Sequence, residues 1–79
     1  MPLTKEDILK RIDNDFVYHA PFGDQVQRYA DLREAGRQLA IKIVESTPIS
    51  REQSLALTKL EEAIMHANSA IARNEIEQK

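Results

Sequence analysis

The residues best suited to binding chemistry in this chain are its aromatic residues, which lie close together. They are Phe16, Tyr18, Phe22 and Tyr29. Flat side chains stack on nucleobases, and a stacked base contributes about 1–3 kcal/mol. For Phe16, Phe22 and Tyr29 we favour another interpretation, in which the rings hold a loop against the rest of the protein. For Tyr18, which precedes His19 in a segment with a proline, both interpretations stay open.

Three arginines follow in the next segment: Arg28, Arg33 and Arg37. Arg33 falls in register with an apolar stripe, so we expect it at the border of an interface. There a guanidinium group suits a phosphate, through two parallel hydrogen bonds, or the face of a purine. The alternative is an ion pair with a carboxylate, for which the candidates are Glu34, Glu61 and Glu62. We assign Arg28 and Arg37 to that alternative.

A second basic row recurs every seven residues and consists of Lys59, His66 and Arg73. Such a row is usually a solvent-exposed edge with ion pairs. In an oligomer, the rows of several subunits can also converge near a symmetry axis and form a positive pocket.

Catalysis and metal binding are not expected from the residue types present. His19 and His66 are the two histidines, and no His-Glu-x-x-His spacing or similar ligand motif is present. The chain has no cysteine, no nucleophile elbow and no glycine-rich phosphate loop. We therefore expect a binding protein without enzymatic activity, metal or cofactor.

Three helices should carry these residues, at about 5–13, 24–46 and 51–75. Thr4 with Asp7 predicts the start of the first helix, which we expect to end at Asn14 and Asp15. Ser50 and Gln53 predict a reciprocal capping box at the start of the third. Pro21 and Gly23 favour an extended loop over 16–23, and residues 75–79 read as a fraying tail.

The second and third helices should form an antiparallel pair, because about four residues join them. The third helix has an apolar seam with 3,4,3,4 spacing: Leu57, Leu60, Ile64, Ala67 and Ile71. Gly36 in the middle of the second helix favours close helix packing over a ligand contact. The expected fold is all-α, a single domain over 1–79 with a short N-terminal helix followed by a two-helix hairpin.

The size and charge of the chain limit its partners. A helical chain of 79 residues without cysteine has a thin core. The third helix also has apolar or small residues on more than one face. We therefore expect a homo-oligomer, in which other subunits cover these faces. The net charge of −2 argues against broad binding to DNA or RNA. With no signal peptide and no run of about 20 apolar residues, we expect no membrane partner and an intracellular location.

Several motifs resemble the helical hairpin family of small phage anti-CBASS proteins. They are FVYHAP, RYxxxR, SLALTKLEEA and ANSAIARN, and the resemblance extends over about residues 16–74. It implies a compact homohexamer with binding sites between subunits. It also implies sequestration of cyclic di- and trinucleotides, such as cyclic GMP-AMP, without degradation. The place of action would be the cytoplasm of the infected bacterial host.

The resemblance also implies roles for individual residues. Tyr18 would stack on a base, His19 would assist, and Arg33 would hold a phosphate or a base. Arg73 would serve subunit assembly or a second site for cyclic trinucleotides.

Two other functions stay open. One is a helical protein-interaction module without a nucleotide ligand, and the other is a sponge for cyclic ADP-ribose signals of Thoeris defence. Members of that related hairpin family carry extra sequence that these 79 residues lack.

Overall fold

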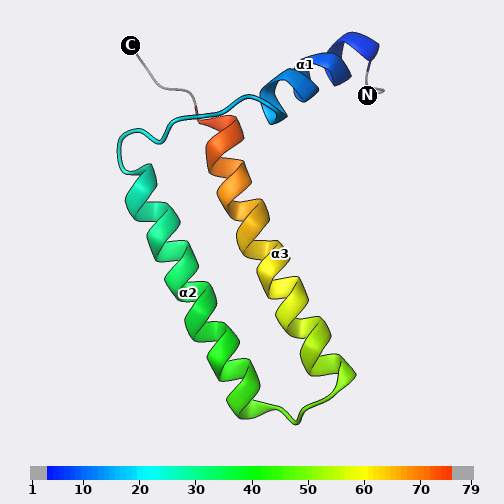
Figure 1. Ribbon diagram of the computed structural model, residues 1–79, viewed down its shortest axis with the longest axis vertical. Helices are drawn as coiled ribbons and strands as arrows, with labels where there is room; N and C mark the ends of the chain where they lie inside the picture. The colour runs from blue at the N-terminus through cyan, green and yellow to red at the C-terminus, as the bar shows by residue number, and fades with distance from the viewer. Residues whose placement is uncertain (1–3, 76–79) are drawn as a thin grey trace.

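The computed structural model describes residues 4–75, which form three α-helices (Figure 1). Helix α1 spans Lys5–Asp15, α2 spans Gln25–Ser46 and α3 spans Arg51–Asn74. Helices α2 and α3 lie side by side as an antiparallel hairpin, and α1 extends away from the open end of that hairpin. The all-α hairpin expected from the sequence is therefore confirmed. No helix of the described residues is long and apolar enough to span a membrane.

Helix α1 begins with the expected cap and ends two residues later than predicted. Thr4 and Asp7 form a complete capping box, with the Asp7 N–H donating to Thr4 Oγ1 over 3.0 Å. The predicted bound at residue 13 was two residues short, since Asn14 and Asp15 form the last turn of the helix instead of following it. The Phe16 N–H donates to the carbonyl oxygen of Ile12, which extends the helical hydrogen bonding through Asp15.

Helix α3 begins at the predicted cap, but the capping box is only half formed. The Ser50 hydroxyl accepts from the Gln53 N–H over 3.1 Å, as expected. The Gln53 side chain does not return to Ser50. Its Nε2 instead donates to the backbone carbonyl and the hydroxyl of Thr47, each over 3.1 Å. Gln53 thus closes the turn between α2 and α3 and is nearly buried there.

Close packing between α2 and α3 explains the mid-helix glycine. Gly36 is buried, and a Cβ atom at this position would lie 2.8 Å from Cγ1 of Ile64. This distance is shorter than carbon atoms normally approach, so a larger residue here would force the Ile64 side chain to shift, and glycine lets the two helices meet closely at this level. All five predicted seam residues of α3 are partly buried (Leu57, Leu60, Ile64, Ala67 and Ile71). The predicted seam and the packing role of Gly36 are confirmed.

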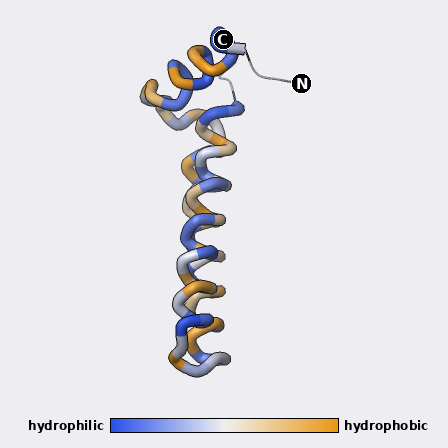
Figure 2. The backbone as a smooth tube through the Cα atoms, turned by 90° about the vertical axis from the view of Figure 1, so that its right-hand side faces the viewer, coloured by the Kyte–Doolittle hydropathy of each residue, from blue (hydrophilic) through white to orange (hydrophobic). Residues whose placement is uncertain are grey.

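The hairpin has no closed core of its own. Within residues 4–75, no hydrophobic side chain is fully buried, and the large apolar residues that stay exposed lie on all three helices. Figure 2 shows hydrophobic and hydrophilic positions alternating along the whole hairpin and around α1. A single chain therefore leaves a large apolar surface in water, which is unfavourable unless something covers it.

The end of α3 is better held than the sequence indicated. The helix stops at Asn74, one residue earlier than predicted, and the Glu75 N–H caps it by donating to the Ile71 carbonyl over 3.2 Å. The expectation that the fraying tail begins at Glu75 was wrong, because this side chain forms an ion pair with Arg28 on α2. The remainder of that expected tail, residues 76–79, lies outside the described residues.

Candidate functional site

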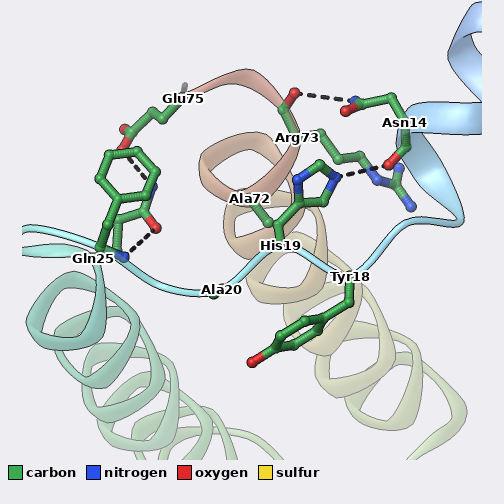
Figure 3. Close-up of a pocket in the computed structure, with 9 residues that line it drawn as sticks. Asn14, Tyr18, His19, Ala20, Gln25, Ala72, Arg73 and Glu75 are labelled. Atoms are coloured by element: carbon green, nitrogen blue, oxygen red, sulfur yellow. Dashed lines mark hydrogen bonds between the residues drawn. The ribbon is translucent and has the colours of Figure 1, made fainter. Parts of the chain in front are cut away.

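A pocket of about 320 Å³ lies at the open end of the hairpin, where the α1–α2 loop crosses the last turn of α3 (Figure 3). Ligand sites in proteins typically occupy about 300–1,000 Å³, so this pocket is at the small end of that range. Three predicted site residues line it together: Tyr18, His19 and Arg73. The first two come from the loop and the third from α3, so residues more than 50 positions apart meet here.

The side chain of Tyr18 is largely exposed within one chain. The residue is 83% exposed, so the ring does not pin the loop to the hairpin within one chain. Figure 3 shows it directed away from His19 and along the hairpin. Phe16 is 86% exposed, so the packing role favoured for it was wrong. Phe22 and Tyr29 are partly buried, in agreement with that role.

His19 and Arg73 lie on the side of the pocket that faces α1. The His19 Nε2 is 2.8 Å from the Asn14 carbonyl oxygen, so this ring nitrogen carries the proton and donates. The Asn14 side chain in turn donates to the Arg73 carbonyl oxygen over 3.1 Å. The Arg73 Nε lies 3.3 Å from Oδ1 of Asp15, in an ion pair that joins α3 to α1. These contacts fix the α1 end of the loop.

The opposite side of the pocket is built around a buried amide. Gln25 is only 3% exposed; its Oε1 accepts from the Phe22 N–H over 3.2 Å, and its Nε2 donates to Glu75 over 2.9 Å. Glu75 also accepts from the Arg28 guanidinium, whose Nη1 is 2.7 Å from Oε2. Arg28 has a further carboxylate partner, because its Nη2 lies 3.1 Å from Oδ1 of Asp24.

This arrangement favours the charged forms of both Arg28 and Glu75. Hydrogen bonds from Arg28, and then from Gln25, lower the pKa of Glu75 from 4.5 to about 2. The hydrogen bond to Glu75, with the further bond to Asp24, raises the pKa of Arg28. The ion-pair role predicted for Arg28 is confirmed, although its partners are Asp24 and Glu75 and not the glutamates expected from the sequence.

Arg33 does not lie in this pocket. It lines a separate groove of about 310 Å³ along the middle of the hairpin, beside Gly36, Leu60 and Ile64. Since α2 begins at Gln25, eight residues before Arg33, the groove is displaced from the pocket by about 12 Å along the helix. The structure of one chain thus separates Arg33 from the other three predicted site residues.

The remaining basic residues form ordinary surface pairs. Arg37 lies 3.3 Å from Glu34 on the same helix, which confirms its predicted ion pair. Lys59 lies 3.5 Å from Glu62, in agreement with a solvated edge, and His66 is exposed. Within residues 4–75, no three His, Cys, Asp or Glu side chains are grouped in a way that could hold a metal ion.

The sequence did not indicate the polar residues that shape the pocket. Asn14, Asp15, Gln25 and Glu75 make contacts across 47 to 59 positions of the chain, as in the Asn14–Arg73 hydrogen bond. No helix periodicity relates residues so far apart. The one available signal was the position of Glu75 at a predicted helix end, where a side chain can reach the neighbouring helix.

Comparison with protein families identifies the hairpin. The family model described as "Acb2/Tad1, hairpin domain" matches residues 9–72, most of the chain. The chain belongs to this family. Neither the curated proteins nor the solved structures that were searched contain a match. Membership in the Acb2/Tad1 hairpin family implies binding of cyclic nucleotides, and the sponges of this family are binders that do not act as catalysts.

Proposed function

We propose that this Acb2/Tad1 hairpin protein binds and sequesters cyclic di- and trinucleotide immune signals without degrading them. Free signal would fall below the level that activates the CBASS effector, in the cytoplasm of the infected bacterial host. Sequestration requires affinity and copy number but no turnover. The observation that carries the proposal is the pocket in which Tyr18, His19 and Arg73 meet, in a chain of this family.

Each of these residues has a chemical role in the proposed complex. The exposed ring of Tyr18 offers a face for one nucleobase, which would bury surface that a single chain leaves in water. His19 donates from Nε2 to a carbonyl, so its other ring nitrogen is an acceptor in the neutral form. Arg73 is 45% exposed and adds a guanidinium group for a phosphate or for a neighbouring subunit.

Arg33 supports a site built between subunits. It lies too far along α2 to reach the pocket of its own chain, but it borders an open apolar groove. When a second chain covers that groove, Arg33 of one chain can approach Tyr18 of another. A cyclic dinucleotide has two bases, two phosphodiesters and approximate two-fold symmetry, so two copies of each residue would match it. We propose a homohexamer, in which each 9.0 kDa chain also covers apolar surface of its neighbours.

Calorimetry with a ligand panel tests the proposal. The panel contains cyclic GMP-AMP, other cyclic dinucleotides, a cyclic trinucleotide and cyclic ADP-ribose. Tyr18→Ala should weaken binding by about 1–3 kcal/mol for each base that it stacks on. Arg33→Ala should cost about 1.5–3 kcal/mol, as for a hydrogen bond to a charged group. Phe16→Ala is the matched control, since this ring is equally exposed on the same loop but does not line the pocket.

Two further measurements complete the test. Light scattering after size exclusion should give about 54 kDa for six chains of 9.0 kDa, in the parent and in each variant. Ligand released by denaturing the complex should be chromatographically identical to the ligand added. Failure of every panel member to bind would favour the alternative of a protein-interaction module. Linear products would show an active site and refute sequestration without degradation.

A further inference from the structure

The α1–α2 loop is attached at both of its ends to one short segment at the end of α3, which consists of Arg73 in the last turn and the cap residue Glu75. On the α1 side, Asn14 donates to the Arg73 carbonyl, and Asp15 pairs with the Arg73 guanidinium. On the α2 side, Gln25 and Arg28 both donate to the Glu75 carboxylate. Figure 3 shows the loop crossing the end of α3 between these two attachments, with Tyr18 and Ala20 in the span. The end of α3 therefore serves as a platform for the loop.

The attachment on the α2 side is the more specific of the two. Gln25 is almost fully buried, and both ends of its amide are engaged, by the Phe22 N–H on one side and Glu75 on the other. A buried amide with both partners fixed has one orientation, because turning it over would place donor against donor. Glu75 is held in turn by two nitrogen atoms of Arg28. Through Gln25 and Glu75, the backbone of Phe22 is thus held at a fixed position relative to the end of α3.

Tyr18 has few other constraints on its position. Its ring is 83% exposed and lies four residues before Phe22, with Pro21 in between. A stacking residue on a mobile loop would lose conformational entropy whenever a ligand binds, and a loop already held in place avoids that cost. The contacts that fix the loop ends therefore affect how tightly Tyr18 can bind a base.

We propose that Gln25 and Glu75 are positioning residues for ligand binding, and that they act through Tyr18. Neither needs to touch the nucleotide. The carboxylate of Glu75 holds the Gln25 amide, the amide holds the Phe22 N–H, and the loop presents the ring of Tyr18. This inference rests on the proposed function, since it concerns affinity for the same cyclic nucleotides.

Glu75→Ala is the test variant, and Glu34→Ala is its matched control. Glu34 also accepts from one arginine and one glutamine, Arg37 over 3.3 Å and Gln38 over 2.9 Å, and its pKa is also lowered. All of its partners lie on α2, so its loss detaches nothing from α3. We expect Glu75→Ala to weaken cyclic dinucleotide binding about tenfold, a coupling typical of members of one hydrogen-bond network. Glu34→Ala should leave affinity unchanged.

A double-mutant cycle with Tyr18 separates positioning from general loss of structure. If Glu75 acts through Tyr18, the Glu75→Ala substitution should have little further effect in a protein that already carries Tyr18→Ala. Purely structural damage would instead lower affinity by the same factor in both backgrounds. Size exclusion with light scattering must show the same assembly for all four proteins.

Amide hydrogen exchange on the ligand-free protein supplies a readout that does not depend on nucleotide binding. The Phe22 N–H should exchange about tenfold faster in Glu75→Ala than in the parent, and should be unchanged in Glu34→Ala. If no nucleotide binds the parent, the proposed function is wrong, and the exchange rates still decide whether Glu75 fixes the loop. If the parent binds and Glu75→Ala binds equally tightly, the positioning role is wrong. Tighter binding by Glu75→Ala would also overturn it, since Glu75 would then be a competing anion.

Discussion

Replacing Gly36 with alanine sets two effects of known sign against each other. Alanine is favoured over glycine inside a helix by about 1 kcal/mol, so the isolated α2 helix would gain stability. In the hairpin, the new Cβ would lie 2.8 Å from Cγ1 and 3.0 Å from Cδ1 of Ile64. Overpacking of this kind costs about 1–3 kcal/mol. We expect the steric term to exceed the helix term, for a net loss of about 1 kcal/mol.

The assay is thermal unfolding at several protein concentrations, with light scattering to confirm the same assembly. For a domain of this size, a loss of about 1 kcal/mol lowers Tm by about 4–8 °C. Ile64→Ala removes the atoms that the methyl group would meet, so Gly36→Ala should cost less in that background than in the parent. A Gly36→Ala protein that melts higher than the parent by the full helix-propensity gain would refute the close contact between α2 and α3.

Two further predictions concern the loop and its attachment. Gly23 has φ 58°, and a Cβ atom at this position would meet nothing within 4 Å. Gly23→Ala should therefore cost about 1–2 kcal/mol through backbone strain alone, and Gly23→Asn should cost less. Thermal unfolding of both variants measures these costs. Because the pKa of Glu75 is about 2 in the folded chain and 4.5 otherwise, the unfolded chain takes up this proton first as the pH falls. The stabilisation linked to Glu75 should therefore be complete above about pH 4.5 and be lost toward pH 2. In a series of unfolding curves over this pH range, the stability of Glu75→Gln should depend less on pH than the stability of the parent.

The helices and their seam could be predicted because they follow from contacts between near neighbours in sequence. Seam residues such as Leu60 and Ile64 recur at helical spacing, and Gly36 violates helix propensity at the level where the helices touch. The boundary errors also have local causes. Asp15 lies inside α1 because Phe16 N–H finds a partner one turn back, which residue type alone does not determine.

The pocket could be predicted only in part, because it depends on which segments meet. Tyr18 and His19 were identified by residue type, and Arg73 by its motif. Nothing in the local sequence distinguishes Gln25 from Gln27 or Gln38, which both bond to acidic residues on their own helix. Gln25 is buried and reaches Glu75 because the hairpin brings residue 75 back to the start of α2. A partner 50 positions away is decided by the tertiary fold, and periodicity carries no information about it.

The distribution of charge within one chain agrees with the proposed binding site between subunits. Near the pocket, Arg73 is paired with Asp15 and Arg28 with Glu75, so the positive charge of each is already offset. The ion pairs found within residues 4–75 do not include Arg33, which lies in the groove away from the pocket. In the proposed assembly, a ligand with two phosphodiester charges would find an aromatic face on one chain and the guanidinium group of Arg33 on another. Assembly would therefore bring together the two halves of the site, and a chain with a net charge of −2 could bind an anion without a basic surface.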